Sequence, residues 1–250
     1  MSARVRRRGL LCELHAHSTW SDGTLPLREL VDLYGRAGFD VLCVTDHALR
    51  SDDPWYVEQR ARDGRTLVDA GNFDAYVAAI DLEAERARVR YSMLVVPGLE
   101  LTYNDLDPNN AAHAVAVGLR AFVPLDTGIF EALGAAREAG AALIAAHPHG
   151  RKADTIPRNT TRRFWREWSR FAPLVDRVEL FNQTNLYSWV ASQDVPVVAS
   201  GDFHRVEHLS SWKTLLPCLR GERAVIDYLR SPAPAHLLPF RAEIAEQAAA

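Results

Sequence analysis

Residues 10–23 read LLCELHAHSTWSDG, and this stretch decides how the rest of the sequence is interpreted. It begins with an apolar run of the kind that forms a buried strand. The run gives way to His15 and His17, whose two-residue spacing puts both imidazoles on one side of a strand. Polar side chains at the end of a buried strand are typical of the rim where β/α barrels carry their active sites.

Further apolar runs along the chain resemble the first and are mostly separated by segments with helical periodicity, which is the pattern of βα units. This pattern, in a chain of 250 residues with 48% hydrophobic content, predicts a small β/α barrel in a single domain, 1–250. Helices are expected at 26–37, 72–90, 127–139, 161–170, 184–192 and 222–230, before an Ala-rich tail at 242–250. We count seven strands, at 10–15, 41–46, 93–99, 113–119, 142–147, 175–181 and 195–201.

One connection departs from the βα pattern. Residues 101–112 are rich in turn formers and too short for a helical crossover. The third and fourth strands are therefore predicted to form an antiparallel hairpin. This hairpin would place His113, at the start of one strand, at the same rim as Glu100, at the end of the other.

Composition and charge exclude several classes of protein. The formal net charge is −3, from 29 basic and 32 acidic residues, so no global positive field favours binding to duplex nucleic acid or an anionic membrane. Cys12, Cys43 and Cys218 lie far apart, mostly in apolar runs, and predict reduced thiols in a cytoplasmic protein. The basic N-terminus precedes an apolar run too short for a signal peptide or a membrane span.

Histidines and carboxylates gather at the predicted strand ends. A single histidine there is more often a hydrogen-bonded structural group than a ligand, so the inference depends on the coincidence of many. Imidazole and carboxylate together suit Zn, Mn or Fe, and a dense mixture of both indicates more than one ion. The histidines are six of the nine in the chain, and the full set is His15, His17, His47, His147, His149 and His204 with Asp22, Asp46, Glu100 and Asp202.

Taken together, the motifs HAHSTWSDG, TDH at 45–47, GLE at 98–100, AHP at 146–148, GDFH at 201–204 and the strand-initial His113 resemble those of the PHP (polymerase and histidinol phosphatase) superfamily. The resemblance covers about residues 10–205. It implies a distorted, TIM-like barrel of seven strands with two or three divalent metal ions at its C-terminal mouth. The implied ligands are His15, His17, Glu100 and Asp202 for a first ion, Glu100, His113 and His147 for a second, and Asp22, His47 and His204 for a third.

The resemblance also implies hydrolysis of phosphate esters, as a phosphomonoesterase or phosphodiesterase on a small metabolite or nucleotide. A hydroxide bridging two ions would attack phosphorus, with Glu100 holding both ions. His149 is the candidate that protonates the leaving oxygen, although a solvent-facing or supporting role is equally compatible with its position.

Basic residues concentrate between Arg151 and Arg170. Such a run is usually a solvated helix face, and the aromatic residues within it are more often buried than stacked on a base. Because the run starts beside His147, we expect Arg151 and Lys152, together with Arg205, to contact a substrate phosphate. The expected partner is a small phosphorylated molecule, a mononucleotide or a short single strand, and the sequence leaves the oligomeric state open.

Two other functions remain open at this point. A metal-activated hydroxide could instead cleave a non-phosphate ester, an amide or a carbamate. The metals could also be structural, in a non-catalytic module that binds a partner protein. The complete set of ligands argues against this second alternative.

Overall fold

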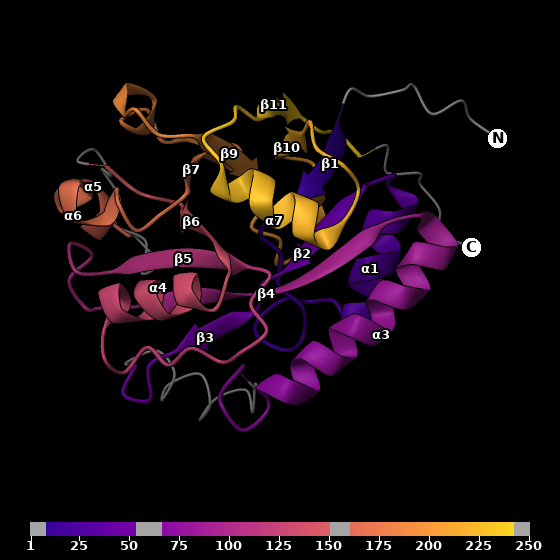
Figure 1. Ribbon diagram of the computed structural model, residues 1–250, viewed down its shortest axis with the longest axis horizontal. Helices are drawn as coiled ribbons and strands as arrows, with labels where there is room; N and C mark the ends of the chain where they lie inside the picture. Colours follow the sequence, from indigo (N-terminus) through magenta and orange to yellow (C-terminus); the bar gives the residue numbers. More distant parts are fainter. Residues whose placement is uncertain (1–8, 54–66, 151–160, 243–250) are drawn as a thin grey trace.

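The computed structural model describes residues 9–53, 67–150 and 161–242. They form a mixed α/β fold around a curled, barrel-like sheet (Figure 1). Its strands are β1 (Leu10–Glu13), β2 (Val41–Val44), β3 (His47–Leu49), β4 (Leu94–Tyr103), β5 (Ala112–Val117), β6 (Ala142–Ala146), β7 (Arg177–Asn182), β8 (Asn185–Leu186), β9 (Val197–Ser200), β10 (Trp212–Leu216) and β11 (His236–Pro239). The helices are α1 (Leu27–Arg36), α3 (Phe73–Tyr91), α4 (Ile129–Glu138), α5 (Arg163–Arg166), α6 (Trp168–Phe171) and α7 (Glu222–Arg230), with 3-10 turns η1 (Val190–Ser192) and η2 (Val206–Leu209).

The strands are joined in the order β11-β10-β1-β2-β4-β5-β6-β7-β8, with β3 paired to β4 and β9 paired to β7. All seven predicted runs form strands, namely β1, β2, β4, β5, β6, β7 and β9. The predicted count of seven is nevertheless too low, because four more strands extend this sheet in the described residues. The expected helix at 184–192 is also wrong, since this segment holds β8 and the short turn η1.

Helices cover both faces of the sheet. Side chains of α1, α3 and α4 pack into one apolar cluster, and those of α7 pack into a second one with alternate residues of the same strands. Cys12 and Val41 belong to this second cluster, whereas their neighbours Leu11 and Leu42 belong to the first. Burial on both faces explains why the strands read as continuous apolar runs rather than as alternating ones.

The loops that follow β1 and β9, the first and last of the predicted strands, are hydrogen-bonded to each other. Phe203 donates its backbone N–H to the carbonyl of His15 at 3.1 Å, and His17 donates to the carbonyl of Phe203 at 2.8 Å. The loops after the first and last predicted strands therefore lie side by side, and both carry predicted metal ligands.

The predicted hairpin of β4 and β5 is confirmed. The two strands are antiparallel, with Thr102 opposite His113, and β5 is also antiparallel to β6, with His113 opposite Ala146. Because β5 runs against its neighbours, its first residues meet the last residues of β4 and β6. His113 therefore lies at the same edge of the sheet as Glu100.

Two further observations concern the cysteines and the lengths of the helices. Cys12, Cys43 and Cys218 are free thiols, the first two of them buried. No helix in the described ranges combines the length and the apolar character that crossing a membrane requires.

Candidate metal centre

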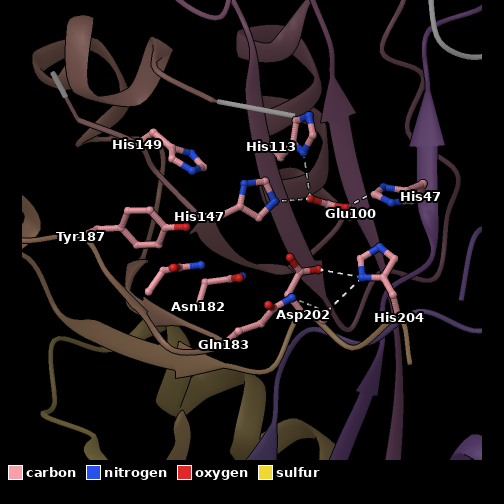
Figure 2. Close-up of a pocket in the computed structure, with 11 residues that line it drawn as sticks. His47, Glu100, His113, His147, His149, Asn182, Gln183, Tyr187, Asp202 and His204 are labelled. Atoms are coloured by element: carbon pink, nitrogen blue, oxygen red, sulfur yellow. Dashed lines mark hydrogen bonds and ion pairs between the residues drawn. The ribbon is translucent and has the colours of Figure 1, made fainter. Parts of the chain in front are cut away.

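The nine predicted metal ligands meet at one edge of the sheet. His15, His17 and Asp22 follow β1, His47 begins β3, Glu100 lies in β4 and His113 lies in β5. His147 follows β6, and Asp202 and His204 follow β9. Figure 2 shows six of these side chains directed toward one another around Glu100. Three groups are close enough to hold an ion: His15, His17 and Glu100; Glu100, His113 and His147; and His17, Asp22, His47 and His204.

The first group has the spacing of metal ligands. Nε2 of His15 and Nε2 of His17 each lie 3.6 Å from Oε2 of Glu100 and 3.4 Å from Oδ1 of Asp202. Ligand atoms of a tetrahedral ion at about 2.0–2.2 Å lie roughly 3.3–3.6 Å apart. The spacing of these four residues therefore suits one ion, and their assignment to a single ion stays a prediction.

Several atoms of this cluster are buried without a hydrogen-bond partner among the described residues: Nε2 of His15, Nε2 of His17, Oε2 of Glu100 and Oδ1 of Asp22. Oε2 of Glu100 also lies 2.6 Å from Nδ1 of His47, which in turn lies 2.7 Å from the hydroxyl of Thr102. Burying an unpaired polar atom is costly, and such atoms call for a ligand. Since they point into the same cluster, a cation is the group that would satisfy them together.

The other two groups share residues with the first. Oε1 of Glu100 lies 3.1 Å from Nδ1 of His113 and 3.1 Å from Nε2 of His147, so the two carboxylate oxygens face different groups. Oδ1 of Asp22 lies 3.3 Å from Nε2 of both His47 and His204. His17 lies 4.0 Å from the same oxygen and belongs to this group as well, which the motifs did not imply.

The carboxylates and imidazoles of the cluster shift the pKa values of one another. Burial opposes ionisation of Glu100, but the imidazoles of His47 and His15 outweigh it and hold the pKa of Glu100 well below its ordinary value. Burial likewise opposes the charged form of His204, yet Asp202 and Asp22 raise the pKa of this imidazole to about 9. Burial and two neighbouring imidazoles lower the pKa of His17 to about 3.

A buried carboxylate that the sequence analysis missed supports the cluster. Oε1 of Glu179, in β7, accepts a hydrogen bond from Nδ1 of His15 at 3.1 Å, and Oε2 accepts one from the backbone N–H of His147 at 2.7 Å. Asn182 and Ser200 also donate to this carboxylate. Because Nδ1 of His15 donates, its Nε2 is left as the lone-pair nitrogen that a metal requires.

Asp46 of the TDH motif supports the HAHSTWSDG loop rather than joining the cluster. Its carboxylate accepts hydrogen bonds from the backbone N–H of Ser18 at 2.8 Å, from the Ser18 hydroxyl at 2.9 Å and from the Ser21 hydroxyl at 2.6 Å. This is the capping role that Asp residues take in tight loops. It fixes the loop that links His17 to Asp22.

A second buried carboxylate, Glu13 in β1, lies behind the GDFH loop. It pairs with the buried ammonium of Lys213, and it accepts hydrogen bonds from the hydroxyl of Tyr34 at 2.9 Å and the backbone N–H of Gly201 at 2.8 Å. A side chain at Gly201 would collide with both Glu13 and Lys213, so any larger residue would displace this buried pair. The pair thereby anchors the chain immediately before Asp202, whose φ of 44° is unusual for a non-glycine residue.

The cluster opens into a pocket of about 300 Å³. Six of the predicted ligands line it together with His149, whose pKa is lowered to about 4 by burial and by His147. The role of His149 as a proton donor stays a prediction. The other lining residues were not foreseen from the sequence and come from the end of β7 and the hairpin with β8, namely Asn182, Gln183, Asn185 and Tyr187.

Of the three residues predicted to contact a substrate phosphate, only Arg205 belongs to the described part of the chain. Arg151 and Lys152 lie outside the described residues. Arg205 is not among the residues that line the pocket; its side chain is 66% exposed and lies 3.8 Å from Glu207. Its proximity to His204 in the sequence does not bring it into the pocket.

The described part of the basic run is organised by one acid. Arg163, Arg166 and Arg170 all pair with Glu167. The predicted helix at 161–170 is two single turns, α5 and α6, and Phe164 between these arginines is fully buried. For these residues, the structure matches the solvated helix face with a buried aromatic side.

Comparison with solved structures finds the same fold. One match comes from Bacteroides vulgatus, "a two-domain protein containing predicted PHP-like metal-dependent phosphoesterase"; it is 19% identical, with a TM-score of 0.66 over 92% of this chain and 64% of that one. Another is an amidohydrolase from Chromobacterium violaceum with bound sulfate and no metal, 15% identical, with a TM-score of 0.51 over 77% of this chain and 87% of that one.

The chain thus spans less than two thirds of the length of the Bacteroides protein. Comparisons with models of protein families and with curated protein sequences give no match. The structural likeness shows that the chain has the fold of PHP-like proteins, in agreement with the superfamily that the motifs indicate.

Proposed function

We propose that this chain is a metal-dependent hydrolase of phosphate esters. The observation that carries the proposal is the group of buried atoms of His15, His17 and Glu100 that lack a hydrogen-bond partner among the described residues, with each Nε2 3.6 Å from Oε2 of Glu100, beside a pocket. A structural metal site is usually closed by four protein ligands, whereas a catalytic site keeps an open side. The second group, Glu100, His113 and His147, has three protein ligands, and all three line a pocket large enough for a small substrate, which favours catalysis over a non-catalytic module.

Three ligand groups would hold two to three divalent ions, with Zn, Mn and Fe as the candidates that imidazole and carboxylate favour. When bound, such ions lower the pKa of water toward neutrality and offset the charge that develops on a phosphoryl group. Glu100 would contribute to the first two groups, since each of its carboxylate oxygens faces one of them. Glu179 would hold His15 and the chain at His147 in place for this role.

Support for phosphate as the electrophile comes from the motifs and from the likeness in fold to a PHP-like phosphoesterase. The size of the pocket favours a small phosphate ester over an internal bond of duplex nucleic acid, and the net charge of −3 favours it too. Contacts of Arg151 and Lys152 with the substrate phosphate belong to this proposal.

The test is a phosphate-release screen over sugar phosphates, nucleotides and short oligonucleotides, with protein reconstituted separately with Zn, Mn and Fe. We expect turnover with at least one metal and none after chelation. His15→Ala would abolish it, and Arg223→Ala, an exposed change on α7, serves as the matched control. Metal bound at two or more ions per chain without release of phosphate from any ester would contradict the proposal.

A second candidate is hydrolysis of an amide, and one observation favours it. The chain shares its fold with the Chromobacterium amidohydrolase. Metal-dependent sites of this kind can activate water against carbonyl as well as phosphoryl groups. Including amide, carbamate and carboxylic ester substrates in the same screen separates the two functions.

A further inference from the structure

The wall of the pocket opposite the metal centre comes from residues 182–187, at the end of β7 and in its hairpin with β8. Asn182, Gln183, Asn185 and Tyr187 line the pocket here, and Figure 2 shows three of them across from Glu100 and His204. We refer to these four residues as the amide wall. Of the described residues that line the pocket, none is a lysine or an arginine.

The amide of Asn182 has a fixed orientation. Its Nδ2 donates to Oε2 of Glu179 at 2.8 Å, and Asn182 is 3% exposed. A carboxylate only accepts hydrogen bonds, so the amide cannot turn its oxygen toward Glu179. Its Oδ1 has no hydrogen-bond partner in the described part of the chain and is left for the pocket.

Gln183 is held in the same way. Its Nε2 lies 3.4 Å from the backbone carbonyl of Asp202, which only accepts, and 3.2 Å from Nδ1 of His208. The chain is bent to place it, since φ of Gln183 is 52°. As in Asn182, the amide N–H groups face protein acceptors, so the amide oxygen is the atom that can accept a hydrogen bond in the pocket.

Tyr187 completes the wall with a hydroxyl. Its ring packs edge-on against His149 at 5.2 Å, and the residue is 7% exposed. The hydroxyl makes no hydrogen bond to any described residue, and burial raises the pKa of the phenol, so the group stays neutral. The amide wall is therefore uncharged and rich in hydrogen-bond acceptors.

We infer that the amide wall binds the leaving group of the substrate, and that this leaving group is uncharged and carries hydroxyl groups, as in the phosphate ester of a polyol or sugar. Hydroxyl donors would meet the free oxygens of Asn182 and Gln183. A second phosphate would meet the same oxygens and neither lysine nor arginine among the described lining residues, which would cost affinity. This inference rests on the proposed function, because it assumes that the phosphate lies at the metal centre.

The experiment compares three esters of similar size with the metal-loaded enzyme: glycerol 3-phosphate, propyl phosphate, and propanediol bisphosphate. Each lost hydrogen bond weakens binding by roughly three- to ten-fold. We expect KM for glycerol 3-phosphate to be lower than for the other two, with Tyr187→Phe raising it about three- to ten-fold and leaving KM for propyl phosphate unchanged. Leu186→Ala, on the exposed side of the same hairpin, is the matched control and should change neither value.

Calorimetric binding of the corresponding phosphonates, which are not hydrolysed, separates failure of this inference from failure of the proposed function. Preference for the glycerol phosphonate without turnover of any ester would support the amide wall and contradict the phosphoesterase. Turnover with equal KM for glycerol and propyl esters would overturn the inference alone. A preference for the bisphosphate that disappears in Lys152→Ala would overturn it as well, by showing that a cation dominates recognition.

Discussion

Glu100 and Glu13 are both carboxylates with no exposed surface, yet their surroundings differ. Around Glu13, an ammonium, a hydroxyl and a backbone N–H satisfy the carboxylate. Glu100 is surrounded by imidazoles, and its Oε2 accepts no hydrogen bond from the part of the chain that the structure describes. The countercharge of Glu13 is thus part of the chain, whereas imidazoles can balance Glu100 only while they carry protons. This difference separates a carboxylate that stabilises the fold from one built to receive an ion.

Replacing Glu100 tests the carboxylate that is expected to bind an ion, and this change should have the largest effect. Glu100→Gln removes the charge that two ligand groups share, so we expect metal content to fall by at least one ion per chain and activity to fall about 10³-fold or more. Elemental analysis and steady-state kinetics measure the two effects. Asp22→Ala, which removes a ligand of the third group only, should be milder. The reverse order would show that Glu100 is not shared.

Breaking the ion pair between Glu13 and Lys213 tests the carboxylate that stabilises the fold. Lys213→Met leaves a buried carboxylate without its cation, which costs roughly 3–5 kcal/mol. We expect that loss in the free energy of unfolding of metal-free protein, measured by urea denaturation, and a smaller one for Glu100→Gln. The double variant Glu13→Gln, Lys213→Met should recover part of the stability. If Glu100→Gln destabilises metal-free protein more than Lys213→Met, the distinction between the two carboxylates fails.

Glu179 lies between these extremes, since it is satisfied by hydrogen bonds and yet holds metal ligands. Glu179→Gln replaces an acceptor of the His15 N–H by an amide, and changes of this kind weaken metal binding by about 10- to 100-fold. Competition with a chromophoric chelator measures the affinity. A matched change at a surface carboxylate, Glu85→Gln, should leave it unchanged. Unaltered affinity in Glu179→Gln would mean that the His15 tautomer does not depend on this contact.

The smallest expected effect is a difference in the number of protons released when a metal binds. Because the pKa of His204 is raised to about 9 in metal-free protein, its pairing with Asp202 and Asp22 stabilises the fold below pH 6.5, and this contribution disappears as pH rises through 9. A metal must displace that proton, so Zn binding at pH 7 should release about one proton more in the wild type than in His204→Ala. Calorimetry in two buffers of different ionisation enthalpy counts the protons. Equal release in both proteins would rule out a charged His204.

Much of the sheet could be predicted because buried strands leave a strong signal. The runs around Val41, Leu94 and Ile144 stay apolar on both faces, as a strand covered on both sides must. Strand β10 gave no such signal, because Lys213 interrupts it; only the distant Glu13 makes that lysine compatible with the core. The helix expected at 184–192 was wrong because Tyr187 and Val190 are spaced as on a helix, whereas the turn at Gln183 folds β8 back on β7.

The clustering of the candidate ligands was predictable because they lie in short motifs, and the predicted hairpin placed His113 at the same edge as Glu100. Residues that hold a candidate ligand in position could not be predicted from the sequence. Glu179 sits inside an apolar strand with no motif around it, and its contact with His15 joins positions 164 residues apart. The amide wall was hidden for a similar reason, since Asn182 and Gln183 fall between the strand predicted at 175–181 and the helix predicted at 184–192.

The closure between the loops after β1 and β9 has a consequence for biosynthesis. Gly201 donates to Glu13 across 188 residues, and the loop it begins supplies Asp202 and His204 to a centre started by His15. A nascent chain emerging from the ribosome would carry the first two histidines long before their partners exist, and contacts this distant along the chain form slowly. We therefore expect metal capture to be among the last events of maturation, following translation of nearly the whole barrel.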